Sequence, residues 1–144
     1  MRVSRAIHVA AVALSLGIAL GAHSPTSEAA SPSCDRACLE GMAEKYLAAM
    51  LTHDPSKAPI AKGTRYTENA VTLPLPDGLW RNVDSIGKYR LYVSDPQQGQ
   101  IGFFAKGTEN GGPVLIATRL KIVNGQITEI ESYVPRLTDT ISVI

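Results

Sequence analysis

Three carboxylates stand where the pattern of the chain could turn them toward a cavity. Glu129 and Glu131 alternate on one predicted strand, and Glu68 lies on a shorter one. A carboxylate held in an apolar pocket has a raised pKa and can act as a general acid or base near neutral pH. We therefore expect Glu131 and Glu68 to be candidate catalytic residues, with Glu129 lining the same pocket.

The direction of two of these side chains depends on the register of a hairpin. Asn124-Gly125 lies between two strand-like runs, and this dipeptide is typical of a type I′ turn, which needs a positive φ at both central residues. In a regular register, Glu129 and Glu131 share the apolar face of Ile122 and Ile127 and point into the core. Arg119 then lies on the opposite face, so no Arg119–Glu131 ion pair is expected.

A β-bulge, which is common in curved sheets, leads to the opposite arrangement. One extra residue in the second strand exchanges its two faces, so that Ile130 and Val134 pack inward and both glutamates face solvent. Glutamates are seldom buried without partners, which favours this alternative.

His53 is the third candidate for acid–base chemistry. It ends a predicted helix and precedes Asp54, a carboxylate that could orient the ring of a general base. The alternative is structural, because a histidine at a helix C-terminus interacts favourably with the negative end of the helix dipole.

Aromatic side chains with polar tips suit a concave site for a small, partly apolar ligand. They pack equally well in a core with their polar atoms satisfied, and Trp80 after Gly78 fits that structural role. The candidate ligand-binding residues are Tyr66, Trp80, Tyr89, Tyr92, Thr118 and Glu129.

Cys34 and Cys38 stand four residues apart at the start of a helical pattern, where ideal geometry separates their Cα atoms by ~6 Å. We expect a disulfide in an oxidising compartment. A metal site needs more ligands than two thiols, so no metal and no cofactor are expected. The sequence also lacks a Gly-x-Ser-x-Gly elbow and a phosphate-binding glycine loop.

The order of the predicted elements indicates an α+β domain. Apolar residues at three- and four-residue spacing predict a helix capped by Ser33 and running to about Thr52. A short strand at 65–69 and a proline-interrupted crossing at 73–80 follow. Strand-like runs at 89–93, 100–108, 114–123 and 127–134 predict an antiparallel meander, with 83–89 ambiguous between helix and strand.

Three segments carry a resemblance to a known family: Tyr66–Asn69, Gly78–Trp80 and Arg119–Glu131. With the leading helix, they resemble SnoaL-like members of the nuclear transport factor 2-like (NTF2-like) superfamily, and more narrowly a small secreted domain family of unknown function. The resemblance covers roughly 34–136. It implies a cone-shaped fold, with the N-terminal helix packed across a curved antiparallel sheet of four main strands plus a short strand. The histidine–aspartate pairs of the scytalone dehydratase and ketosteroid isomerase branches have no clear counterpart here.

The first 30 residues have the layout of a secretory signal peptide: a basic start, an apolar stretch and small residues before a cleavage site. We expect a secreted or periplasmic protein, a single domain at 34–136 and a C-terminal tail at 137–144. Without residues 1–29 the chain has twelve basic and twelve acidic residues, which argues against nucleic acid or a membrane surface as a partner.

Two functions fit these observations. The first is a pocket for a small organic ligand, with cofactor-free acid–base catalysis of an isomerase, dehydratase or hydrolase type. The second is a non-catalytic module that forms a homodimer through the outer face of its sheet, because exposed apolar faces usually mark interfaces. In the regular register, Ile130, Val134 and Leu115 would point outward and contribute to that face.

Overall fold

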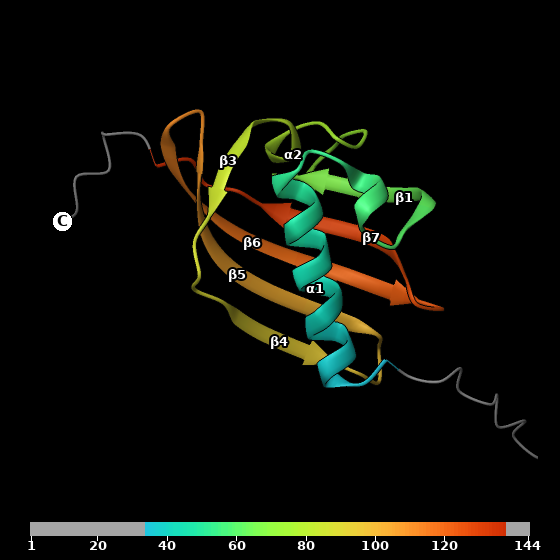
Figure 1. Cartoon of the computed structure of the whole chain (residues 1–144). Coiled ribbons are helices and arrows are strands. Elements are labelled where there is room, and N and C mark those ends of the chain that lie inside the picture. The colour runs from blue at the N-terminus through green and yellow to red at the C-terminus, as the bar shows by residue number, and fades with distance from the viewer. Residues whose placement is uncertain (1–33, 138–144) are drawn as a thin grey trace, which may run out of the picture.

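A single curved sheet and one long helix account for most of the fold (Figure 1). The computed structural model describes residues 34–137, so the predicted signal peptide and most of the predicted tail lie outside the described residues. The order of strands across the sheet is β2-β1-β7-β6-β5-β3, and β4 also pairs with β5. The elements are α1 (Arg36–Leu51), η1 (Pro55–Lys57), β1 (Ile60–Glu68), β2 (Val71–Thr72), α2 (Leu79–Asn82), β3 (Val83–Ile86), β4 (Leu91–Asp95), β5 (Gln100–Glu109), β6 (Gly112–Val123) and β7 (Gln126–Tyr133).

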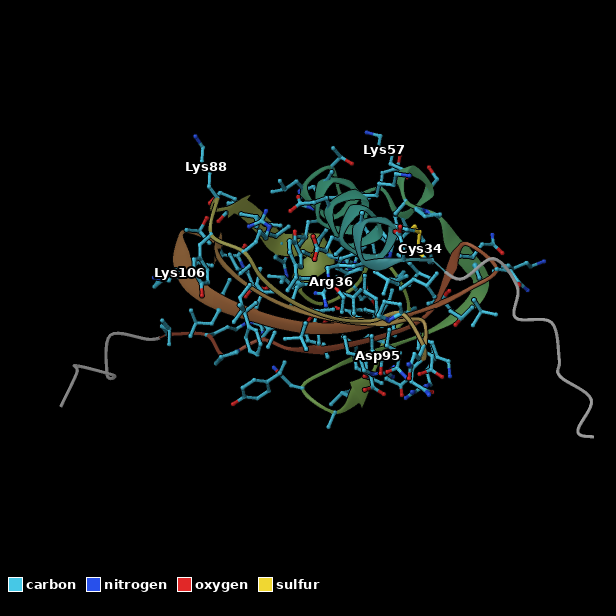
Figure 2. The ribbon with its side chains drawn as sticks, turned by 90° about the horizontal axis from the view of Figure 1, so that it is seen from below. Cys34, Arg36, Lys57, Lys88, Asp95 and Lys106 are labelled. Carbon is cyan, nitrogen blue, oxygen red and sulfur yellow. A yellow bond between two sulfur atoms is a disulfide. The ribbon has the colours of Figure 1, made fainter. Side chains whose placement is uncertain are left out.

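α1 lies in the concave side of the sheet, as the view along the layers shows (Figure 2). Its N-cap is Asp35, whose carboxylate accepts a hydrogen bond from the backbone N–H of Cys38, so the predicted cap at Ser33 is wrong by two residues. The apolar stripe is confirmed: the buried residues of α1 are Leu39, Met42, Ala43, Tyr46, Leu47, Ala49 and Met50. Among residues 34–137, no helix has both the length and the apolar composition needed to cross a bilayer.

The predicted meander is confirmed, because β4, β5, β6 and β7 pair antiparallel in sequence order. Asn124 and Gly125 both have positive φ, 51° and 73°, as the tight turn requires. The sheet is nevertheless mixed, since β1 pairs in parallel with β7 and is longer than expected. A register shift between Ile60 and Arg65, near Gly63 with its positive φ, breaks the alternation that would have revealed the full strand.

A β-bulge decides which side chains of β7 face α1. Lys121 pairs with Glu129, whereas Ile122 pairs with Ile127, so Thr128 is the extra residue. Beyond the bulge, Ile130 is opposite the buried Leu120, and Glu131 is opposite Arg119. The regular register, with both glutamates pointing inward, is therefore wrong, and the bulged alternative is confirmed.

Side chains fill the space between α1 and the sheet. Trp80 is fully buried, and its ring packs edge-on against Tyr46 with 5.2 Å between ring centroids. Tyr46 also packs against Phe103, at 6.0 Å. The other large side chains that are less than 2 % exposed include Tyr66, Leu39, Leu47, Met50, Leu79, Ile101, Ile116, Leu120, Ile127 and Ile130. The concave side of the sheet is therefore a packed core.

Two glycines allow a test of this packing. A Cβ at Gly107 would lie 2.6 Å from the backbone oxygen of Ser85 on the adjacent β3, whereas a Cβ at Gly41, on the exposed side of α1, meets nothing within 4 Å. Gly107→Ala should lower the free energy of unfolding by about 1–3 kcal/mol, because the strands must separate locally. The matched Gly41→Ala should raise it by about 0.5–1 kcal/mol. Urea denaturation of both variants measures this, and a Gly107→Ala protein as stable as the wild type would contradict the packing of β3 on β5.

Candidate functional site

Glu68 is buried, and protein donors already engage its carboxylate. Its Oε2 accepts hydrogen bonds from the Tyr66 hydroxyl, at 2.7 Å, and from the backbone N–H of Leu79, at 2.8 Å. Its Oε1 accepts from Arg136 Nη2, also at 2.8 Å. The residue is 5 % exposed. These bonds join the end of β1 to the start of α2 and to the segment after β7. The carboxylate of Glu68 therefore has a structural role in this arrangement.

Arg136 pairs with a second buried carboxylate. Its Nε and Nη2 both donate to Glu109, which is 8 % exposed and ends β5. One half-exposed guanidinium therefore neutralises part of the charge on two carboxylates that come from different strands. Buried charges need such pairing, because their desolvation costs several kcal/mol per ion.

Two further pairs of polar side chains in the core bond to each other. Trp80 Nε1 donates to the Tyr46 hydroxyl at 3.0 Å, and Thr118 Oγ1 and Ser132 Oγ lie 2.9 Å apart. Burial raises the pKa of Tyr46 and of Tyr66, so both hydroxyls stay protonated. The sequence-predicted residues Tyr66, Trp80 and Thr118 are thus brought together with Glu68 on one side of the sheet, in a filled interior.

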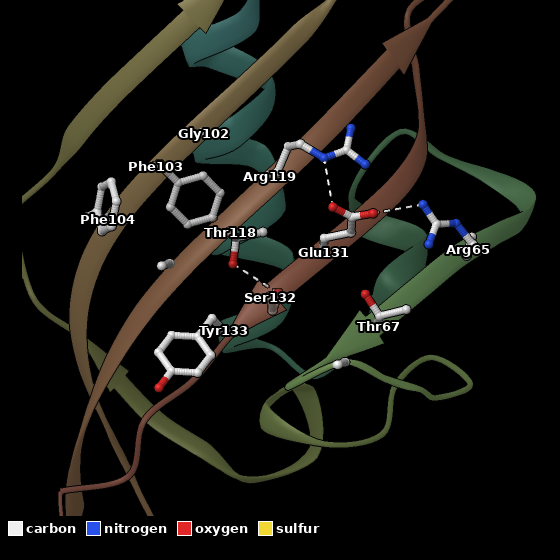
Figure 3. A pocket seen from close by; sticks show the side chains of 12 residues that line it. Arg65, Thr67, Gly102, Phe103, Phe104, Thr118, Arg119, Glu131, Ser132 and Tyr133 are labelled. Carbon is white, nitrogen blue, oxygen red and sulfur yellow. Dashed lines mark hydrogen bonds and ion pairs between the residues drawn. The ribbon is translucent and has the colours of Figure 1, made fainter.

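The opposite, outer face of the sheet carries a network of four charged side chains, Arg65, Arg119, Glu129 and Glu131. Figure 3 shows Glu131 between Arg119 and Arg65. Arg119 Nε donates to Glu131 at 3.0 Å, and its Nη2 donates to Glu129 at 2.6 Å. Arg65 Nη2 donates to Glu131 at 2.8 Å and to Glu129 at 3.3 Å. The expectation that Arg119 and Glu131 do not pair is therefore wrong, and the reason is the bulge at Thr128, which places both on one face.

These contacts lower the pKa values of both glutamates. Arg119, and then Arg65, lower the pKa of Glu131 to about 2, and Arg119 chiefly lowers that of Glu129. The raised pKa expected for an inward-facing Glu131 is not found, because its carboxylate lies outside the core beside two guanidinium groups. At neutral pH both glutamates are ionised.

A hollow of about 600 Å³ opens on this outer face beside the network. Gly102 and Ala117 lie in it, the rings of Phe104 and Tyr133 flank it on one side, and the Arg119–Glu131 pair flanks the other (Figure 3). A second hollow of about 420 Å³ adjoins it and is mostly apolar, with Tyr89 among its lining residues.

Large apolar side chains are exposed around these hollows. Along four strands they alternate with the residues that face α1, so they share the outer face. Leu91, Phe104, Ala117 and Tyr133 form one row across β4, β5, β6 and β7, because each is the register partner of the next. The exposed members of the face are Leu91, Val93, Phe104, Leu115, Val123 and Tyr133. The expected position of Leu115 is confirmed, whereas Ile130 and Val134, expected on the same face, are buried because the bulge turns them toward α1.

The other predicted site residues are dispersed. His53 Nδ1 contacts the backbone oxygen of Trp80 at 2.6 Å, while Asp54 bonds to Ser56, so the predicted His53–Asp54 pairing does not form. Tyr92 faces α1, where burial and its hydrogen bond to Glu44 raise its pKa to about 12.

The predicted disulfide between Cys34 and Cys38 is confirmed, with 5.2 Å between the two Cα atoms. It joins the residue before the cap of α1 to the first turn of that helix.

Sequence reasoning missed Arg65, Arg136 and Gly102. A signal for the bulge is nonetheless present, because Ile127 and Ile130 are three residues apart and cannot both face one side of a regular strand. The contacts of Arg136 join residues 27 and 68 positions apart, a separation over which local patterns say nothing.

The charge network predicts how Glu131 titrates. Its carboxyl should protonate with a pKa of about 2 instead of 4.5, so its contribution to stability is complete above pH 4.5 and is lost as the pH falls toward 2. Arg119→Gln should raise this pKa toward 4.5, and Arg65→Gln should raise it less. NMR titration of the side-chain carboxyl carbon measures both, with Arg36→Gln as a distant control. A wild-type pKa of 4 or above would show that the network does not form.

Replacing Arg136 should lower the free energy of unfolding more than replacing an ordinary surface arginine. Arg136→Met leaves Glu68 and Glu109 without their cation, so the free energy of unfolding should fall by more than about 2 kcal/mol. Arg36→Met, which removes an exposed pair with Glu40, should change it by less than about 0.5 kcal/mol. Chemical denaturation compares the two variants, and equal effects would mean that the buried pairs do not contribute.

Comparison with known proteins defines the family. Residues 32–134 match the family described as Domain of unknown function (DUF8021). No curated protein matches the chain. Among solved structures, a de novo designed protein with a curved β-sheet is 15 % identical, with 70 % of this chain and 88 % of that chain covered and a TM-score of 0.54.

A candidate ketosteroid isomerase from Kribbella flavida DSM 17836 is 14 % identical, with 69 % of this chain and 78 % of that chain covered and a TM-score of 0.51. At such identities the similarity concerns the fold alone. The chain therefore belongs to the DUF8021 family, a domain of unknown function, and has the α+β fold of the NTF2-like, ketosteroid isomerase-like proteins.

Proposed function

We propose that this domain is a non-catalytic interaction module that forms a homodimer through the outer face of its sheet. The observation that carries the proposal is the row of exposed apolar side chains that crosses four strands on that face, Leu91, Phe104 and Tyr133 among them. Exposed contiguous apolar surface on a small domain marks an interaction site, because leaving it in water is unfavourable.

The charges on the same face support pairing with a second copy. Arg65 and Arg119 balance Glu129 and Glu131, so the network carries no net charge and two copies do not repel each other through it. An interface between identical surfaces needs both signs of charge on each partner, since the same patch meets itself.

A small organic ligand is the second candidate, and the hollow of about 600 Å³ beside Phe104 and Tyr133 favours it. Acid–base catalysis of an isomerase, dehydratase or hydrolase type has less support. Protein donors occupy the carboxylate of Glu68, and the Glu131 carboxylate is engaged by two arginines.

Export of the protein is also part of this proposal. The basic and apolar start of the chain predicts a signal peptide. The Cys34–Cys38 disulfide is compatible with an oxidising compartment such as the extracellular space.

Sedimentation tests the interface. The wild-type domain should sediment as a dimer at micromolar concentration. Phe104→Glu places a charge in the apolar row and should weaken association at least tenfold, while circular dichroism shows an unchanged fold. Leu51→Glu is the matched control, because Leu51 is 39 % exposed but lies on α1, on the other side of the sheet. A monomeric wild type, or equal dimerisation of the two variants, would rule out this face.

A further inference from the structure

Gly102 is a glycine that the single chain does not need. Its φ is not positive, and a Cβ built on it would have the backbone oxygen of Val93, at 3.9 Å, as its nearest neighbour, which is an ordinary contact. Glycine within a strand lowers stability, and it often marks a place where another group approaches the backbone closely. Gly107 on the same strand differs, because β3 leaves no room for a Cβ there.

The missing side chain helps to form the outer-face hollow, and Tyr133 stands beside that hollow with 63 % of its surface exposed. The face thus has a projecting aromatic ring and an empty space close together (Figure 3). A tyrosine exposed to this extent in a regular strand leaves most of its ring in water, which is unfavourable unless another surface covers it.

The register relates these two features by symmetry. Phe103, Thr118 and Ser132 are aligned across β5, β6 and β7; Gly102 lies one residue to one side of this line, and Tyr133 one residue to the other. Consider two copies that meet through this face, with a two-fold axis between them. If the axis passes over Thr118 and is perpendicular to the line from Gly102 to Tyr133, the rotation exchanges these two positions. Each Tyr133 then meets the Gly102 of the other copy.

The same axis also brings compatible groups together elsewhere. Adjacent strands lie ~4.8 Å apart, and each residue advances a strand by ~3.4 Å. On a grid with these spacings, the two-fold rotation brings Arg119 of each copy next to Glu131 of the other. It also brings Leu91 of each copy next to Leu115 of the other. In the same arrangement, Phe104 of each copy lies over Ala117 of the other, and Ala117 is a small residue in the hollow. Charge and apolar surface are therefore complementary in one and the same arrangement.

We propose that the Tyr133 side chain of each copy inserts into the hollow over Gly102 of the other, so that the interface contains two equivalent aromatic insertions. This inference rests on the proposed homodimer and specifies how its surfaces fit. It accounts for an exposed tyrosine, a glycine in mid-strand and a hollow by one contact.

A complementation experiment tests the insertion. Gly102→Leu fills the hollow, and Tyr133→Ala removes the ring, so each variant alone should show a dimer Kd at least tenfold above that of the wild type. In an equimolar mixture, the leucine introduced at position 102 meets the space vacated at position 133, and the other Tyr133 meets an unchanged Gly102. Heterodimers should therefore exceed the statistical half of all dimers, as native mass spectrometry of differently tagged chains can measure. Leu51→Ala, a substitution on α1 at the other side of the sheet, should change the Kd less than threefold.

The possible outcomes distinguish failure of the Tyr133 insertion from failure of the proposed homodimer. A monomeric wild type would overturn both the homodimer and the insertion. A dimeric wild type with statistical mixing of the two variants, or with a Gly102→Leu variant that dimerises normally, would overturn the insertion alone. If Gly102→Leu dimerises normally but loses binding of 2-naphthol that the wild type shows by fluorescence, the hollow belongs to a small ligand. Thermal unfolding of each variant confirms that the fold is retained.

Discussion

One extra residue in β7 organises both faces of the sheet. At Thr128 the strand gains a residue over its partner β6, and from there the alternation of side chains is inverted relative to a regular hairpin. Ile130 can then pack under α1 while Glu131 meets Arg119 on the outer side. Burial of an isoleucine in place of a charged glutamate is favourable by several kcal/mol, which is why the bulged register prevails. The core, the ion network and the outer hollow all depend on this choice.

The interior uses its polar groups for structure. Glu68 and Glu109 come from β1 and β5, which do not pair with each other, and Arg136 ties both to the chain beyond β7. The Tyr66 hydroxyl and the backbone N–H of Leu79, at the start of α2, donate the other hydrogen bonds to Glu68. These donors are all engaged with the carboxylate, so the cluster holds β1, α2 and the segment after β7 together. The rings of Tyr46 and Trp80 pack against each other in the same interior.

The outer face has the opposite character, with exposed rings, a hollow and a balanced set of charges. On a domain of this size, large apolar side chains exposed in one row need a reason, and the single chain supplies none for Gly102 or Tyr133. The proposed second copy would supply one, because in that homodimer it covers the rings and meets each arginine with a glutamate. The fold is shared with proteins of the ketosteroid isomerase-like class, and in this chain the exposed apolar side chains of β4, β5, β6 and β7 lie on the side of the sheet away from the helix.

The sequence by itself determined the elements whose signals are local. The helical stripe from Leu39 to Met50, the Asn124-Gly125 turn, the four-stranded meander and the close cysteine pair all follow from spacing within a few residues. Only the tertiary structure decided what depends on distant partners: the parallel pairing of β1 with β7, the bulge at Thr128, and the pairing of Arg136 with Glu68. The strand pairing and the ion pair join residues far apart in the sequence, and the bulge is a competition between burying one face of β7 or the other. Packing against α1 settles that competition, because it rewards only the register that buries apolar side chains.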